Sequence, residues 1–221
     1  ESKRIGACIR SASFADQVLV VDGGSRDDMA EIARGLGAEV HTYPDWQGFA
    51  HQRNHQLAHA RGDYIFFLDA DEEITDGLRE ELQQVVRSNA DGVWIVRWIQ
   101  VAFGRQLTHM RNSVGVRRLF KRANLSHFEG VVHEHPVQRT THPERDLRHR
   151  LLHHSRETIY GSLLKLAQYA QLGAVKRAGR RGGILRGLAS GLASFVRLYF
   201  LQLGILCGAQ GFLYCLFVSL E

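Results

Sequence analysis

The feature that most constrains the fold is a short apolar run, Tyr64–Leu68, which ends in four carboxylates within five residues. The run has the length and composition of a buried parallel strand. Open α/β sheets bind their ligands at the carboxyl ends of such strands. We therefore expect Asp69 and Asp71 to mark a ligand site at one edge of a sheet.

Carboxylates this close repel one another, so the cluster is costly unless a cation or a network of donors neutralises it. A hard divalent ion is the natural partner, because it bridges protein carboxylates to phosphate groups. The alternative is a solvated acidic turn that opens a helix at Thr75, since acidic residues are common at helix N-termini. In either case, we expect Glu72 and Glu73 to lead into that helix rather than to touch a metal.

Strand and helix patterns alternate along the first part of the chain, which predicts an α/β fold with a parallel sheet. The expected strands cover 17–22, 38–43, 64–68, 92–100 and 116–122, and the expected helices cover 2–12, 25–36, 49–60, 76–88 and 157–177. Ser25 followed by Asp28 resembles a capping box with Asp in place of Glu. Polar, histidine-rich connections run out to His154.

The composition favours a globular protein with an anionic partner. The 221 residues are 44% hydrophobic and 23% charged, with a net charge of +5. Nucleic acid, an anionic membrane and a phosphorylated substrate all fit that charge. We expect no nucleic-acid partner, because the basic residues form no recognition motif. The three cysteines form no CxxC pair, which fits a reducing compartment.

The C-terminal region predicts membrane association. No charged residue occurs from Leu198 to Leu220, a length that would cross a bilayer. Three interpretations remain open: a span, an in-plane or re-entrant helix pair, and a core helix of a larger protein. Basic flanks beside a long apolar run favour an anionic membrane surface. The flanking arginines, expected on the cytoplasmic side, are Arg177, Arg180, Arg181, Arg186 and Arg197.

The order of the motifs resembles family 2 glycosyltransferases with the GT-A fold. Val20–Asp28 resembles their V-V-D-x-G-S-x-D segment, and Leu68–Glu72 matches their D-x-D metal motif. The further matching blocks are Trp46–Phe49, Gln52–Asn54, Gly104–Arg105, Arg118–Phe120, Val132–Glu134 and Leu152–His153. Together they resemble the bacterial lipopolysaccharide core β-1,4-glucosyltransferase type.

The resemblance implies a Rossmann-like, mostly parallel sheet flanked by helices. We expect a catalytic domain over 1–155 that binds a nucleotide-sugar and an acceptor, and a helical, membrane-associating region over 156–221. The family normally opens with an apolar strand that ends near Asn-Glu. Glu1 stands where that Glu would be, so we expect the first strand to be missing and the chain to be truncated.

The resemblance implies a donor site. Asp22 ends a strand beside a glycine turn, where its carboxylate would accept from a uracil-type base or a ribose hydroxyl. The alternative is that Asp22 only closes the turn. Arg53 would pair with phosphate or, alternatively, lie on a solvated helix face. The implied donor-binding residues are Asp22, Gly24, Ser25, Arg53 and Asp69.

The resemblance also implies a metal, Mg²⁺ or Mn²⁺, held by Asp69, Asp71 and His153. The ion would stabilise charge on the leaving diphosphate. Imidazole is a borderline ligand for such ions, and the alternative for His153 is a structural histidine.

Glu134 follows an apolar pair at a plausible strand end and, by resemblance, is the catalytic base. Sugar transfer with inversion needs one base to take the proton of the acceptor hydroxyl. The alternative is a surface ion pair with a nearby basic residue. Arg105, His109 and Arg118 form a basic set that would face an anionic acceptor or, alternatively, lie on the sheet surface.

The leading hypothesis is therefore an inverting, metal-dependent enzyme that moves a hexose, glucose, from a UDP-sugar to a lipopolysaccharide core or other lipid-linked saccharide. It would act at the cytoplasmic face of the bacterial inner membrane, against its anionic surface. The alternatives are transfer to polyprenyl phosphate, capsule or O-antigen intermediates, and a non-catalytic nucleotide-binding membrane protein.

Overall fold

The computed structural model describes residues 2–130, 134–176 and 183–221. The chain falls into two compact units. The first contains residues 1–98 and 115–151, and the second contains 99–114 and 152–221. Strands β5 (Val93–Ala102) and β10 (Glu144–Arg156) each contribute residues to both units. The predicted boundary at 155 stays a prediction.

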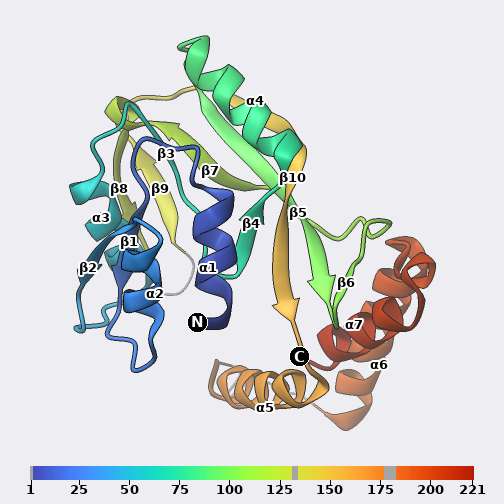
Figure 1. Ribbon diagram of the computed structural model, residues 1–221. Helices are drawn as coiled ribbons and strands as arrows, with labels where there is room; N and C mark the ends of the chain where they lie inside the picture. The colour runs from blue at the N-terminus through green and yellow to red at the C-terminus, as the bar shows by residue number, and fades with distance from the viewer. Residues whose placement is uncertain (1, 131–133, 177–182) are drawn as a thin grey trace. The chain divides into compact units, whose positions relative to one another are not determined.

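The first unit begins with a small parallel layer (Figure 1). Strand β1 (Leu19–Asp22) pairs in parallel with β2 (Glu39–Thr42), and helix α2 (Met29–Gly35) connects the two strands along the chain. Helix α1 (Ser2–Ser11) packs against α2. The side chains buried among these elements are apolar: Ile5, Ile9, Met29, Ala33 and Ala38.

The predicted capping box of α2 is wrong. Asp28 occupies the N-cap position, but its side chain makes no capping hydrogen bond. The Ser25 backbone N–H instead donates to Asp22 Oδ1 at 2.9 Å. The carboxylate that ends β1 therefore organises this turn, and the helix begins later than the pattern predicts.

The larger sheet is mixed, with strand order β3-β7-β5-β10-β4, and β6 pairs with β5 beside this path. At its edge β3 (Tyr64–Phe66) runs antiparallel to β7 (Val116–Lys121), with Ile65 opposite Phe120. The prediction of a parallel strand at 64–68 is therefore wrong in its pairing. An apolar run indicates that a strand is buried, but it does not identify the strand that pairs with it. Here the pairing strand, β7, lies about fifty residues further along the chain.

Two helices and a hairpin complete the first unit. Helix α3 is Phe49–His59, and α4 is Asp76–Arg87. The Thr75 hydroxyl caps α4 by accepting from the Leu78 N–H. After the short 3₁₀ turn Arg122–Asn124, strands β8 (Leu125–Glu129) and β9 (His135–Gln138) pair antiparallel. Strand β4 (Glu72–Ile74) leads directly into the Thr75 cap. Three strands, β8, β9 and β10, lie where only polar connections were expected.

The second unit holds β6 (Arg105–Gln106) and the C-terminal helices α5 (Ile159–Lys176), α6 (Ile184–Val196) and α7 (Gly208–Leu220). A π-helical turn, Arg197–Leu201, continues α6, and a 3₁₀ turn, Gly204–Cys207, precedes α7. The predicted flanking residues Arg177, Arg180 and Arg181 lie outside the described residues.

The uncharged run from Leu198 to Leu220 does not form one helix. Leu203 and Gly208 adopt positive φ of 62° and 67°, conformations that interrupt an α-helix. Helix α7 packs against α6 instead. Within the described residues, the segment Ile184–Leu201 is long and apolar enough to cross a membrane by length and composition.

Candidate active site

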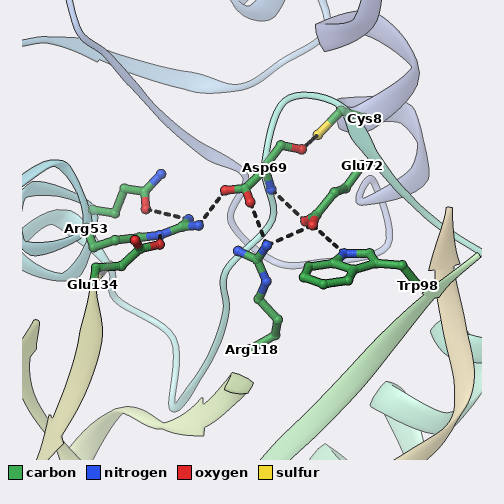
Figure 2. A network of polar contacts seen from close by, with 8 residues as sticks. Cys8, Arg53, Asp69, Glu72, Trp98, Arg118 and Glu134 are labelled. Atoms are coloured by element: carbon green, nitrogen blue, oxygen red, sulfur yellow. Dashed lines mark hydrogen bonds and ion pairs between the residues drawn. The ribbon is translucent and has the colours of Figure 1, made fainter. Parts of the chain in front are cut away.

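The carboxylate of Asp69 lies at the centre of an ion network just beyond β3 (Figure 2). Arg53 Nη2 donates to Asp69 Oδ1, and Arg118 Nη2 donates to Asp69 Oδ2 at 2.5 Å. Both arginines are only 7% exposed. Burial by itself would raise the pKa of Asp69, but the charges and hydrogen bonds of Arg118 and Arg53 lower that pKa well below its usual range.

Glu72 is a central member of this network, which the sequence does not reveal. Its side chain is 1% exposed. Oε1 accepts from Arg118 Nη2 at 2.7 Å and from the Trp98 indole at 2.6 Å. Oε2 accepts from the Asp69 N–H at 2.9 Å. Burial raises the pKa of Glu72 despite the opposing charge of Arg118. Glu72 therefore fixes the backbone at Asp69, a larger role than leading into α4.

Helix α1 flanks the acidic segment on its other side. Cys8 Sγ donates to the Asp69 carbonyl oxygen at 3.4 Å (Figure 2), and burial raises the pKa of the Cys8 thiol to about 12. Arg4 Nη1 lies 3.8 Å from Asp71 Oδ2, and both side chains are 29% exposed. The Asp69 side chain is the more exposed of the two, at 44%, although both of its oxygens accept from arginines.

Glu134 joins the same network through Arg53 (Figure 2). Its Oε1 lies 3.8 Å from Arg53 Nε, and its side chain is 27% exposed. The expected alternative of an ion pair is therefore present, and its partner is buried. Arg53 and Glu134 lie more than eighty residues apart in the sequence. The fold nevertheless brings both Glu134 and Asp69 next to the Arg53 guanidinium. The alternative of a solvated helix face for Arg53 is wrong.

The second acidic strand end, Asp22, closes a turn. Asp22 is 4% exposed, and its Oδ1 accepts from the N–H groups of Gly24 at 3.2 Å and Ser25 at 2.9 Å. Gly24 has φ of 89°, and a Cβ there would lie 3.2 Å from Pro44, so this position requires glycine. These contacts form the turn that the alternative interpretation predicts, and the donor roles of all three residues stay predictions.

A buried amide lies beside this turn without a hydrogen-bond partner among the described residues. Neither Nε2 nor Oε1 of Gln52 is satisfied there. Gln52 Nε2 and the Trp46 ring lie 3.8 and 3.5 Å from where a Cβ on Gly23 would stand. Trp46 and Phe49 are about half exposed and meet edge to face at 5.0 Å. Because buried polar groups are nearly always paired, this amide is suited to a ligand with both a donor and an acceptor.

The predicted acceptor residues do not share one environment. Arg118 is buried against Asp69 and Glu72, and its Nη2 contacts both carboxylates. Arg105, in β6, and His109 are exposed and belong to the second unit. His153 also belongs to the second unit, in β10. The acceptor roles and the metal role of His153 stay predictions.

Comparison with known proteins gives one family. The family model for glycosyl transferase family 2 matches residues 1–147. The lipopolysaccharide core biosynthesis glycosyltransferase LpsC of Rhizobium meliloti (strain 1021) is 28% identical over 227 residues, covering 96% of this chain and 82% of LpsC. An uncharacterized glycosyltransferase of Rickettsia prowazekii, RP128, is 37% identical over 90 residues, which are 40% of this chain and 30% of that protein.

Two solved structures are similar at low identity. Mannosyl-3-phosphoglycerate synthase from Rubrobacter xylanophilus has a TM-score of 0.47 at 16% identity, covering 83% of this chain and 73% of that one. S. aureus TarS residues 1–349, solved in complex with UDP-GlcNAc, has a TM-score of 0.44 at 15% identity, covering 66% of this chain and 56% of that one. The chain spans about a third of the length of the Rickettsia relative, but the family match covers well over half of the chain, so the chain belongs to glycosyl transferase family 2.

Proposed function

We propose that this chain transfers a hexose, glucose, from a UDP-sugar to a lipopolysaccharide core or other lipid-linked saccharide, with inversion at the sugar. The observation that carries the proposal is the shared guanidinium of Arg53, which joins Asp69 of the D-A-D segment to Glu134. The family supports the reaction class. The name of the LpsC relative, which aligns with 96% of this chain, supports the acceptor class.

Glu134 is the proposed base. Inverting transfer needs a carboxylate to take the proton of the acceptor hydroxyl while the nucleotide leaves from the opposite face of the sugar. Glu134 is partly exposed, so a hydroxyl can reach it, and the Arg53 guanidinium lies 3.8 Å from its carboxylate. Arg53 is itself held by Asp69 and is nearly buried. The base is therefore positioned by the same network that holds the acidic segment, which limits its movement relative to the donor.

The acidic segment fits a metal through Asp71 better than through Asp69. The Asp69 side chain is 44% exposed, but both of its oxygens already accept from arginines. The Asp71 side chain is 29% exposed, and the Arg4 guanidinium lies 3.8 Å from its carboxylate. Asp71, with Asp69, would hold Mg²⁺ or Mn²⁺ on the side of the first unit. When bound, such an ion stabilises negative charge on a leaving diphosphate. Asp69 then acts chiefly by keeping the loop in place.

The nucleoside end of the donor is proposed to lie beside Asp22. The turn at Gly24 and Ser25 leaves backbone close to the surface, and the exposed ring of Trp46 offers a stacking face. The unpaired Gln52 amide offers one donor and one acceptor, which matches the imide edge of a uracil-type base. Arg105 and His109 are proposed to contact an anionic acceptor, such as a phosphorylated core sugar.

The test is a donor screen that measures released UDP with Mn²⁺ or Mg²⁺, using deep-rough lipopolysaccharide and polyprenyl phosphate as acceptors in separate arms. UDP-glucose with lipopolysaccharide is expected to give the highest turnover. Asp71→Ala is expected to lose metal-dependent turnover, whereas the neighbouring Glu73→Ala keeps it. Normal turnover by Asp71→Ala would exclude the metal role. Turnover only with polyprenyl phosphate would replace the proposed acceptor.

A further inference from the structure

We infer that this protein has a second cation site, separate from the acidic segment, in which Glu39, His41 and His59 bind a transition-metal ion of the Zn²⁺ class. Each of these residues offers one ligand atom, and the three atoms all lie within 4.8 Å of one another. All three side chains are half-buried. Neither the family match nor the proposed transfer reaction requires this cluster.

The fold brings the three residues together from two elements. Glu39 and His41 are two residues apart on β2, so their side chains leave the same face of the strand. His59 lies in the last turn of α3. The imidazole rings of His41 and His59 stack at 3.7 Å between centroids. The Tyr43 hydroxyl, from just beyond β2, lies 2.6 Å from His59 Nε2.

The donor set determines the class of ion. Two imidazoles and one carboxylate are ligands of catalytic and open zinc sites, at about 2.0–2.2 Å from the metal. Such a set suits Zn²⁺, Co²⁺ and Ni²⁺ more than Mg²⁺, which prefers oxygen ligands. Tetrahedral bonds of that length place ligand atoms roughly 3.3 Å apart. The side chains therefore need to rotate so that the stacked rings turn edge-on to the ion and the ligand atoms, now within 4.8 Å of one another, come closer by up to about 1.5 Å.

The competing interpretation is a simple polar network around Glu39. Arg61 donates to both Glu39 oxygens, from Nη2 to Oε2 at 2.8 Å and from Nη1 to Oε1 at 3.3 Å, and Gln17 Nε2 donates to Oε2 at 3.0 Å. The Arg61 side chain is 70% exposed, and exposed ion pairs contribute only about 0–1 kcal/mol. A chelated ion gains far more than that from its ligands, so an ion at Glu39 would displace the bidentate Arg61.

The site begins at the end of the parallel layer opposite to Asp22 and reaches along β2 to His41, which is paired with Val21. Glu39 is paired with Leu19 at the start of the two strands, whereas Asp22 is paired with Thr42 at their end. An ion bound here would connect the edge strand β2 to the end of α3 across the first unit. Its expected effect is to stabilise the folded chain, because a ligand that binds only the folded state raises its stability.

The test measures Zn²⁺ and Co²⁺ binding to chelator-treated chain by calorimetry, by the visible absorption of bound Co²⁺, and by the melting temperature. The wild-type chain is expected to bind one equivalent and to melt at a higher temperature with Zn²⁺. His41→Ala and His59→Ala are expected to weaken binding at least about tenfold, the lower limit for disturbing even an outer partner of a metal site.

His149→Ala is the matched control, because His149 Nδ1 lies 3.1 Å from Glu81 just as His41 Nε2 lies 2.8 Å from Glu39. It is expected to bind Zn²⁺ as the wild type does. Circular dichroism checks folding, and Glu39→Gln, which keeps the shape of the side chain, should also weaken binding.

The inference is overturned if the wild type binds no Zn²⁺ or if the His41 and His59 variants bind it as tightly. Asp71→Ala should leave this binding unchanged.

Discussion

At the scale of single residues, the acidic segment is neutralised by guanidinium groups that come from elsewhere in the chain. The close carboxylates predict either a cation or a donor network, and the structure supplies the network for Asp69 and Glu72 through Arg118 and Arg53. Arg118 is the critical partner, because it touches both carboxylates and is nearly buried. A buried carboxylate that loses such a partner is left uncompensated.

Replacing Arg118 with Leu is therefore expected to destabilise the fold by about 3–5 kcal/mol, the usual cost of breaking one side of a buried ion pair. The neighbouring Arg117→Leu is the control, because Arg117 is 45% exposed and pairs with the exposed Glu144. That change should cost about 1 kcal/mol or less. Urea denaturation measures both variants, and equal costs would contradict the assignment of Arg118 to a buried network.

The sequence predicts which acidic residues gather, but not which of them is buried. Asp69 and Asp71 stand out because they end an apolar run. Glu72 does not, since a glutamate before a helix cap is usually solvated. Its burial depends on the Trp98 indole and the Arg118 guanidinium, which arrive from strands β5 and β7. That information lies in the pairing of distant strands and not in the local pattern.

At the scale of elements, the sequence predicts the regular helices and strands of the first hundred residues better than their partners. Helices α1, α3 and α4 and strands β1, β2 and β5 lie close to where they are expected. Strands β8–β10 are missed because their polar, histidine-rich residues do not alternate in hydrophobicity. Strand β8 is held instead by hydrogen bonds between Asn54 and the Phe128 backbone. The break before α7 is likewise a consequence of tertiary packing.

Gly211 allows the start of α7 to pack closely against the turn that precedes it. A Cβ on Gly211 would collide with the Gly204 carbonyl oxygen and stand 2.7 Å from Cys207 Cβ, within the turn that precedes α7. Gly211→Ala is therefore expected to destabilise the second unit by about 1–3 kcal/mol through overpacking. Gly187→Ala, in α6, meets nothing within 4 Å and should be neutral or stabilising by up to about 1 kcal/mol. Thermal unfolding followed by circular dichroism compares the two, and equal stability would contradict the close packing.

At the scale of the whole molecule, positive charge and exposed apolar side chains occur together. The net charge is +5, and α6 carries leucines that are strongly exposed, among them Leu185 at 84% and Leu188 at 65%. Such a combination is typical of a protein that binds an anionic membrane surface. It supports the proposed location at the cytoplasmic face of the inner membrane, where a lipid-linked acceptor would be presented.

We expect the chain to co-sediment with anionic phospholipid vesicles and to be released in part by salt, because added ions screen surface charge. Leu185→Glu and Leu188→Glu are expected to weaken binding about tenfold or more, since burying one leucine contributes about 1.5–3 kcal/mol. Val114→Glu is the control, because Val114 is 81% exposed but lies outside the helices. Equal binding by all three variants would contradict docking through α6.

The most direct test of the proposed reaction is the rate of sugar transfer from UDP-glucose to deep-rough lipopolysaccharide by Glu134→Gln. We expect a loss of about 10²–10⁴-fold in kcat, the usual contribution of a general base, with UDP affinity unchanged. Glu129→Gln is the matched control, because Glu129 is an exposed carboxylate that ends β8 and pairs with His127, and it should keep the wild-type rate. Transfer at the wild-type rate by Glu134→Gln would contradict the account.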